Sequence, residues 1–207
     1  MKKNGLILGT SSSSLVNFRL DFLKSLIDVD IKVSVVSSKP DKRSLNTLKE
    51  IGVGYGTIFL RRNGLNPVDD VKTFIDLLAL FIKIKPEFIL AYGIKLVIWG
   101  GLSARLTRTP FFALITGLGF SFQGDTFKRR LLTKLVAFLY KAALMNSKAV
   151  IFQNKDNLNI FIKLGIVARS KAYIVNGSGV NINRYNIAKF PQSNVSFLCV
   201  SRLLGEK

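Results

Sequence analysis

Three loops rich in glycine and hydroxyl side chains are the segments of this 207-residue chain best suited to hold a ligand. Each follows a short apolar run that predicts a strand. Small residues let the backbone approach a ligand closely, and hydroxyls can donate hydrogen bonds to phosphate or sugar oxygens. A helix N-terminus after such a loop favours an anion. The residues are Gly9, Thr10, Ser11, Ser12 and Ser13 in the first loop, Thr116, Gly117 and Gly119 in the second, and Asn176, Gly177 and Ser178 in the third.

A structural explanation of these loops stays open beside the ligand-binding one. The first loop could be a simple strand-to-helix turn, and the glycines of the other two suit tight turns. None of them has the Gly-x-Gly-x-x-Gly pattern of dinucleotide sites or the lysine of a phosphate-binding P-loop. Local sequence therefore makes these strand ends candidate ligand contacts and leaves the structural explanation open.

Two cations near the end of the chain could hold a diphosphate. The apolar run 195–200 predicts a strand, and a turn with Arg202 and Lys207 follows it before an expected helix. Cations beside a helix N-terminus suit a diphosphate group. As isolated residues the pair carries little specificity.

The overall charge predicts an anionic partner. The chain has 31 Lys and Arg against 12 Asp and Glu, a formal net charge of +19. Nucleic acid, an acidic membrane surface and phosphorylated ligands all fit such a charge. No nucleic-acid motif, such as an aromatic RNP run, accompanies it, so we do not expect a nucleic-acid partner.

A helix expected from Thr126 to Met145 would carry one basic stripe. At 100° per residue the stripe spans about 40° of the helix, and much of the remaining surface is apolar. Such a helix suits the headgroup layer of an acidic membrane. A buried helix with a solvated charged edge is the open alternative. The stripe consists of Arg130, Lys134, Lys141 and Lys148.

Several classes of site and of protein are excluded by what the sequence lacks. The chain has no His, which removes His-based zinc sites and Ser-His-Asp triads, and Cys199 has no second Cys with which to form a disulfide. Cys199 is expected to be a small apolar residue in a core strand. The N-terminal apolar run is too short for a signal peptide, and charges interrupt the most apolar stretch, 74–102. We therefore expect a cytoplasmic protein without a membrane span.

Strand and helix signals alternate along the chain and predict an α/β fold with a doubly wound parallel sheet. Helices are expected at 15–28, 67–83 and 155–164, with Asn66 and Asn154 as N-caps. Strands are expected at 6–8, 31–36, 57–60, 88–92, 111–115, 150–152, 172–175 and 197–200.

The chain is expected to contain one full domain and the beginning of another. A polar segment with Pro191 separates the last two strand signals, so we place the domain at 1–190. Residues 191–207 would then be a linker and the first strand of a second domain that this chain lacks, because a lone strand cannot bury itself.

Taken in order, five segments resemble the retaining glycosyltransferases of the family-4 type. These enzymes have the GT-B architecture, in which two Rossmann-like domains face each other across a cleft. Each segment is weak alone, but together they span most of the chain. They are 9–19, 115–119, 152–156, 176–180 and 200–207. The likeness is strongest to the branch that extends lipid-linked oligosaccharides for surface polysaccharide, including lipopolysaccharide.

The resemblance implies a division of labour between two domains. The first domain would bind a polyprenyl-diphosphate-linked or other glycan acceptor and touch the inner face of the cell membrane as a peripheral protein. The second would hold the nucleotide-sugar donor, with Arg202 and Lys207 neutralising its diphosphate without a metal or other cofactor. The loops at 9–13 and 116–119 would face the reacting sugars. No catalytic residue can be assigned.

Two departures from the family limit what this chain is expected to do. Many relatives carry a cleft His that is absent here, and the paired glutamates of the donor domain are absent, since Glu206 is not part of such a pair. We therefore expect an acceptor-side half that is inactive alone or is completed by a separate chain carrying the donor domain. The alternatives are a non-catalytic membrane- or partner-binding module, a UDP-sugar epimerase fragment, and a nucleotide-dependent oxidoreductase, which the missing glycine pattern disfavours.

Overall fold

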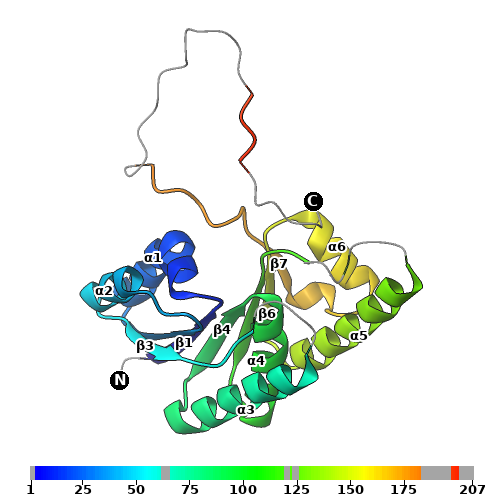
Figure 1. Ribbon diagram of the computed structural model, residues 1–207, viewed down its shortest axis with the longest axis horizontal. Coiled ribbons are helices and arrows are strands. Elements are labelled where there is room, and N and C mark those ends of the chain that lie inside the picture. The colour runs from blue at the N-terminus through cyan, green and yellow to red at the C-terminus, as the bar shows by residue number, and fades with distance from the viewer. Residues whose placement is uncertain (1–2, 62–65, 119–121, 123–125, 183–196, 201–207) are drawn as a thin grey trace.

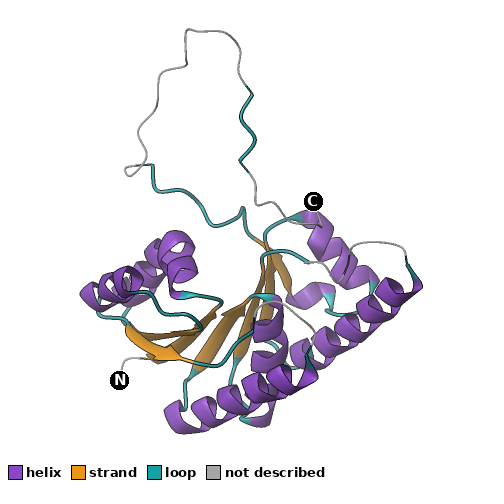
Figure 2. Ribbon diagram, in the orientation of Figure 1, coloured by secondary structure: helices purple, strands orange, loops and turns teal. Residues whose placement is uncertain are grey.

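The computed structural model describes residues 3–61, 66–118, 122, 126–182 and 197–200. These form an open parallel sheet with helices on both faces (Figures 1 and 2). The strands are β1 (Lys3–Gly9), β2 (Ile31–Ser37), β3 (Gly54–Thr57), β4 (Phe88–Tyr92), β5 (Phe111–Ile115), β6 (Ala149–Phe152) and β7 (Ala172–Ile174). The helices are α1 (Ser12–Asp28), α2 (Lys42–Glu50), α3 (Pro67–Ile84), α4 (Ile94–Leu106), α5 (Phe127–Leu144) and α6 (Lys155–Lys163), with a short 3₁₀ turn, η2 (Arg169–Lys171).

The strand order confirms the predicted doubly wound sheet. The order is β3-β2-β1-β4-β5-β6-β7, and every neighbouring pair is parallel. The chain starts in the middle, builds outward to β3, then returns to β4 and builds toward the other edge. The order therefore reverses between β1 and β4. In open α/β sheets, ligands bind beyond the carboxyl ends of the strands at such a reversal.

Strand β1 lies inside the sheet and is buried on both faces, so the core has two layers. Leu6 and Leu8 pack with side chains of α3 and α4, while Ile7 packs with Leu15 and Leu23 of α1. The helices follow this division, since α1 packs on α2, and α4 packs on α3 and α5 (Figure 1). Apolar runs without alternation are typical of strands buried in this way.

The helix starts follow the predicted capping chemistry. The Asn66 side chain accepts a hydrogen bond from the Val68 amide, Pro67 occupies the first helical position, and Asp69 and Asp70 lie in the first turn of α3. The Asn154 side chain accepts from the Asn157 amide at the start of α6. Each cap satisfies an amide that has no partner within its own helix.

The third strand differs from its predicted range of 57–60. β3 spans Gly54–Thr57, and Leu60 is buried in the coil that follows. The apolar run marked a segment that packs on the core rather than the strand itself. Glycine has a low strand propensity, yet at Gly56 a Cβ would lie 3.2 Å from Val36 Cγ2, so the neighbouring strand leaves little room for a side chain.

The strand predicted at 197–200 as the start of a second domain is not formed among the described residues. These four residues have no strand pairing, and Phe197, Leu198 and Val200 are 96%, 88% and 87% exposed. Cys199 is exposed too. A strand needs a neighbour for its backbone groups, and no described segment supplies one. The predicted domain boundary at residue 190 lies outside the described residues.

Candidate functional site

The loop after β1 lies at the carboxyl end of the sheet, at the reversal of strand order. Ser11 caps α1 by accepting a hydrogen bond from the Ser14 amide at 3.2 Å, and its hydroxyl lies 3.2 Å from that of Ser13. Ser13 is exposed, and Thr10 and Ser11 are partly exposed. These three hydroxyls are therefore accessible beside the N-terminus of a 17-residue helix.

Ser12 has a structural role instead of the predicted ligand-facing one. It is fully buried, and its hydroxyl donates to Asp41 Oδ2 at 2.7 Å and to the Lys39 carbonyl at 3.3 Å. The Asp41 carboxylate also accepts from the Ser44 amide and caps α2. The hydrogen bonds from Ser12 and then Ser44 hold the pKa of Asp41 below its usual value. Ser12 thus joins the start of α1 to the start of α2.

Two glycines allow the turns after β1 and β4 to touch. A Cβ at Gly9 would lie 2.6 Å from the Tyr92 hydroxyl, and one at Gly93 would lie 2.5 Å from Thr10 Cγ2. Gly93 also has a φ of 89°, which disfavours any other residue. Gly9 was expected to let the backbone approach a ligand, but here its lack of a side chain makes room for the Tyr92 and Leu15 side chains.

The buried side chain of Arg19 joins the first predicted loop region to the third. Arg19 Nη1 donates to Ser178 Oγ at 2.9 Å, and its guanidinium lies 5.2 Å from the centre of the Tyr92 ring. Gln153 Nε2 also donates to Ser178 Oγ, at 3.3 Å. Asn176 and Gly177 are exposed beside Ser178. In the sequence, Arg19 had no signal beyond its place in the segment 9–19.

The second loop begins at the same edge of the sheet. Thr116 follows the last residue of β5 and is exposed, and a Cβ at Gly117 would meet nothing within 4 Å. Gly117 is therefore not required by packing. Gly119 lies outside the described residues, as do Arg202 and Lys207.

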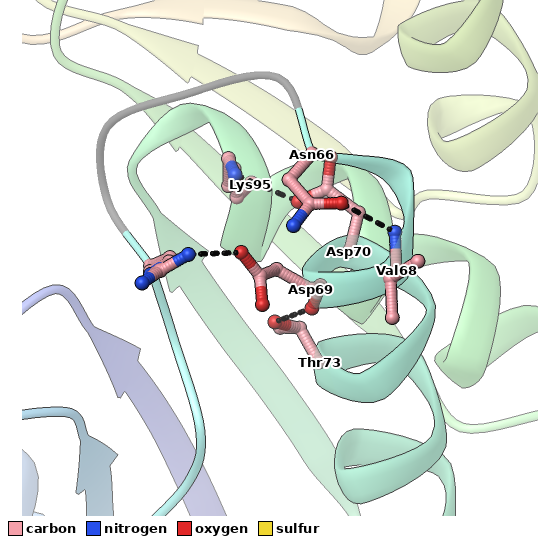
Figure 3. A network of polar contacts seen from close by, with 7 residues as sticks. Asn66, Val68, Asp69, Asp70, Thr73 and Lys95 are labelled. Atoms are coloured by element: carbon pink, nitrogen blue, oxygen red, sulfur yellow. Dashed lines mark hydrogen bonds and ion pairs between the residues drawn. The ribbon is translucent and has the colours of Figure 1, made fainter.

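An ion pair that the sequence analysis missed links the starts of α3 and α4 (Figure 3). Lys95 Nζ lies 2.7 Å from Asp70 Oδ1, and both side chains are largely buried. Arg61 and Asp69 form a second pair, at 3.0 Å. Lys95 is the second residue of α4, directly beyond the carboxyl end of β4. The place of Lys95 just after a predicted strand was the only sign of it in the sequence. Its partner, Asp70, lies on a different helix and could not be inferred.

The outer face of α5 combines exposed cations with exposed apolar side chains. Arg130, Lys134 and Lys141 are exposed, as predicted, whereas Lys148 lies beyond the helix, which ends at Leu144. Lys148 therefore belongs to the turn before β6 and not to the stripe. We define the α5 outer face as Phe127, Arg130, Leu131, Lys134, Leu135, Phe138 and Lys141.

Within the described ranges, no three Cys, Asp or Glu side chains gather in a way that could hold a metal ion. No helix in the same ranges combines the length and apolarity needed to cross a membrane.

Comparisons with known proteins agree with the geometry. The family model described as "Glycosyl transferase 4-like" matches residues 6–154. A relative from Campylobacter jejuni, N,N'-diacetylbacillosaminyl-diphospho-undecaprenol alpha-1,3-N-acetylgalactosaminyltransferase, is 26% identical over 179 residues, which are 86% of this chain and 47% of that protein. The chain thus spans about half the length of this curated relative.

The fold recurs in solved structures. Anabaena HepE in complex with UDP and glucose matches with a TM-score of 0.60 and 14% identity, over 91% of this chain and 47% of that one. MurG from Acinetobacter baumannii matches with a TM-score of 0.56 and 15% identity, over 88% and 47%. A UDP-N-acetylglucosamine 2-epimerase matches with a TM-score of 0.59 and 13% identity, over 84% and 48%. At such identities the structures share only the fold, whereas the family model covers most of the chain; the chain therefore belongs to the glycosyl transferase 4-like family.

Proposed function

We propose that this chain is the acceptor-binding half of a glycosyltransferase of surface polysaccharide synthesis. The complete enzyme would move a sugar from a nucleotide-sugar donor to a polyprenyl-diphosphate-linked or other glycan acceptor. The family membership supports sugar transfer, and the name of the Campylobacter relative specifies a lipid diphosphate acceptor. Because the chain spans 47% of that relative, the whole activity is a proposal for this chain.

The convergence of the loops at the carboxyl edge of the sheet carries the proposal. Thr10, Ser11 and Ser13 lie beside the N-terminus of α1, and Arg19 brings Ser178 to the same region. Thr116 and Gly117 follow β5 at that edge. Hydroxyls and exposed backbone at a reversal of strand order are suited to a polar ligand such as a sugar phosphate.

The chemistry of transfer requires stabilisation of a diphosphate leaving group. Cations held in a closed site can supply it electrostatically, and we propose Arg202 and Lys207 for this role on the resemblance alone. A donor domain would then complete the site. The described part of the chain is proposed to bind the acceptor.

We further propose that the α5 outer face rests on the inner, anionic surface of the cell membrane. Phe127, Leu131, Leu135 and Phe138 are 83%, 62%, 55% and 67% exposed, so they are available to enter the headgroup layer. At 100° per residue, they and the three cations occupy about 140° of the helix. An in-plane helix of this kind combines apolar insertion with attraction to acidic lipids.

Calorimetric titration of the chain with two soluble ligands tests the proposed function. One ligand is a short-chain prenyl-diphosphate-linked N-acetylhexosamine, and the other is UDP-N-acetylgalactosamine. We expect saturable binding of the acceptor analogue and no measurable binding of the donor. Binding of the donor without the acceptor analogue would contradict an acceptor-side half and would favour the epimerase-fragment alternative.

A further inference from the structure

The charge of Arg19 has no carboxylate partner in the described part of the chain. The residue is 9% exposed, and its Nε has no hydrogen-bond partner among the described residues. Burial lowers the pKa of the guanidinium from its ordinary value, which reflects the cost of holding a cation away from water. Buried charges in proteins are ordinarily paired, so an Arg in this state calls for an explanation.

The contacts of the guanidinium within the described residues are with neutral groups. Nη1 donates to Ser178 Oγ at 2.9 Å and, more weakly, to the Phe18 carbonyl at 3.4 Å. The Tyr92 ring lies 5.2 Å from the guanidinium carbon. A guanidinium offers five N–H donors in a plane that matches the oxygens of a phosphate or carboxylate. The Ser178 hydroxyl therefore occupies a position suited to a charged acceptor.

The position of Arg19 adds a second source of positive potential. Tyr92 ends β4 at the carboxyl edge, and its hydroxyl donates to Ser14 Oγ at 3.4 Å in the first turn of α1. The guanidinium is thus near the N-terminal turn of a 17-residue helix, where the helix dipole also favours an anion. Both contributions act at the edge that carries the hydroxyl-rich loops.

The Ser178 turn can withdraw without disturbing the core. Ser178 is exposed and lies between Gly177 and Gly179, which have φ values of 73° and 72°. A Cβ added at either glycine would meet nothing within 4 Å, so the turn is not packed against other segments there. The hydrogen bonds from Arg19 and Gln153 to Ser178 hold it to the domain.

We propose that Arg19 binds a phosphate or diphosphate oxyanion, which replaces the Ser178 hydroxyl as acceptor for Nη1 and also takes the unpartnered Nε–H. The oxyanion would gain two charge-assisted hydrogen bonds in a place shielded from solvent. The phosphate could belong to a prenyl acceptor or to a nucleotide. The assignment to one of them rests on the proposed function.

Nitrogen-15 NMR of the arginine Nε–H groups tests this binding directly. The chain is titrated at constant ionic strength with inorganic pyrophosphate, farnesyl diphosphate and UDP, with sodium chloride as the reference. We expect one Nε–H signal, identified by its loss in Arg19→Lys, to shift saturably with pyrophosphate. Arg19→Gln should weaken pyrophosphate binding about tenfold or more, because it removes the charged donors.

Ser178→Ala separates an oxyanion site from a purely structural contact. Removing the competing hydroxyl should tighten pyrophosphate binding severalfold, and this test stands even if Arg19→Gln fails to fold. The matched control is Arg105→Gln, which removes an exposed cation from the last turn of α4. It should leave the affinity for pyrophosphate unchanged. Stronger binding of farnesyl diphosphate than of UDP would assign the phosphate to the acceptor, and the reverse order to the donor.

The absence of a saturable shift, or equal affinities in the wild type, Arg19→Gln and Ser178→Ala, would overturn the proposal. Arg19→Gln should still sediment with anionic vesicles like the wild type, because Arg19 is buried away from the α5 outer face. A failed oxyanion site is thereby distinguished from a failed membrane role.

Discussion

Positive charge is held in two different ways at the switch-point region and on the α5 outer face. The switch-point region consists of residues 9–14, Arg19, Tyr92, Gly93 and Ser178. There Arg19 is 9% exposed, and its guanidinium is held by contacts with neutral groups. On the α5 outer face, three exposed cations adjoin exposed apolar side chains.

The difference in burial predicts different recognition. Salt at 0.1 M screens exposed charges over about 10 Å. Binding by the α5 outer face should therefore depend on how many cations it carries, and it should weaken as the salt concentration rises. A buried cation is screened much less and acts through geometry. The α5 outer face is thus suited to a surface with diffuse negative charge. The switch-point region is suited to a single anionic group in a fixed orientation.

Charge reversal on α5 is expected to give the largest effect. Lys134→Glu with Lys141→Glu should weaken binding to anionic vesicles by about 4 kcal/mol, roughly a thousandfold, because each cation near such a surface contributes about 1 kcal/mol and each introduced carboxylate is repelled. Co-sedimentation with acidic and neutral vesicles at low and high salt measures this. Lys42→Glu with Lys49→Glu on α2 is the matched control. Equal losses in both double variants would show that net charge alone drives binding.

Substitution of Gly93 should disrupt the switch-point region itself. Gly93→Ala is expected to lower the free energy of unfolding by about 3 kcal/mol, because it forces an unfavourable φ and a contact with Thr10. Urea denaturation measures the loss. Gly52→Ala, with a φ of 74° and no atom within 4 Å of the added Cβ, isolates the conformational part and should cost about 1 kcal/mol. Equal losses in the two variants would contradict the tight contact between the two turns.

Removal of an apolar side chain from the α5 outer face should have a smaller effect that is independent of salt. Phe138→Ser is expected to weaken vesicle binding by about 1 kcal/mol, roughly fivefold, since only part of the ring would leave water at the interface. Ile75→Ser on α3, where the side chain is 56% exposed, is the control. If Ile75→Ser weakened binding as much as Phe138→Ser, the contact would not be specific to α5.

The smallest predicted effect concerns acid stability near the start of α1. The pKa of Asp41 is lowered in the folded protein, chiefly by Ser12, so its stabilising contribution is present above its usual pKa and is lost as pH falls through the folded value. Ser12→Ala should therefore reduce stability at neutral pH and flatten its decline in acid. Thermal unfolding from pH 7 down to pH 3 measures the slope. An unchanged slope would mean that Ser12 does not stabilise the charged carboxylate.

The sheet could be predicted because its strands are buried on both faces. Unbroken apolar runs identify such strands directly, and β4 and β5 have the predicted bounds. β3 was misplaced because its glycines lower strand propensity while the apolar residues after it pack on the core. The run 197–200 looked the same in sequence but has no partner in the described structure.

The candidate site was predictable in position but not in contacts. Strand ends locate the loops, whereas the partner of Arg19 lies 159 residues away in the chain, and Lys95 meets Asp70 across two helices. Periodicity placed the cations of α5 on one stripe. It could not show that Leu131 and Phe138 are uncovered, because that depends on which elements pack against the helix.

The most direct test of an acceptor-binding, membrane-resting half is recruitment to vesicles that contain the acceptor lipid. Vesicles of neutral lipid seeded with a polyprenyl-diphosphate-linked N-acetylhexosamine are compared with vesicles of neutral lipid in which phosphatidylglycerol supplies the same surface charge. We predict tighter binding of the chain to the acceptor vesicles, and loss of binding to both kinds when Lys134 and Lys141 are replaced by Glu. Equal binding to the two kinds of vesicle would contradict acceptor recognition by this chain.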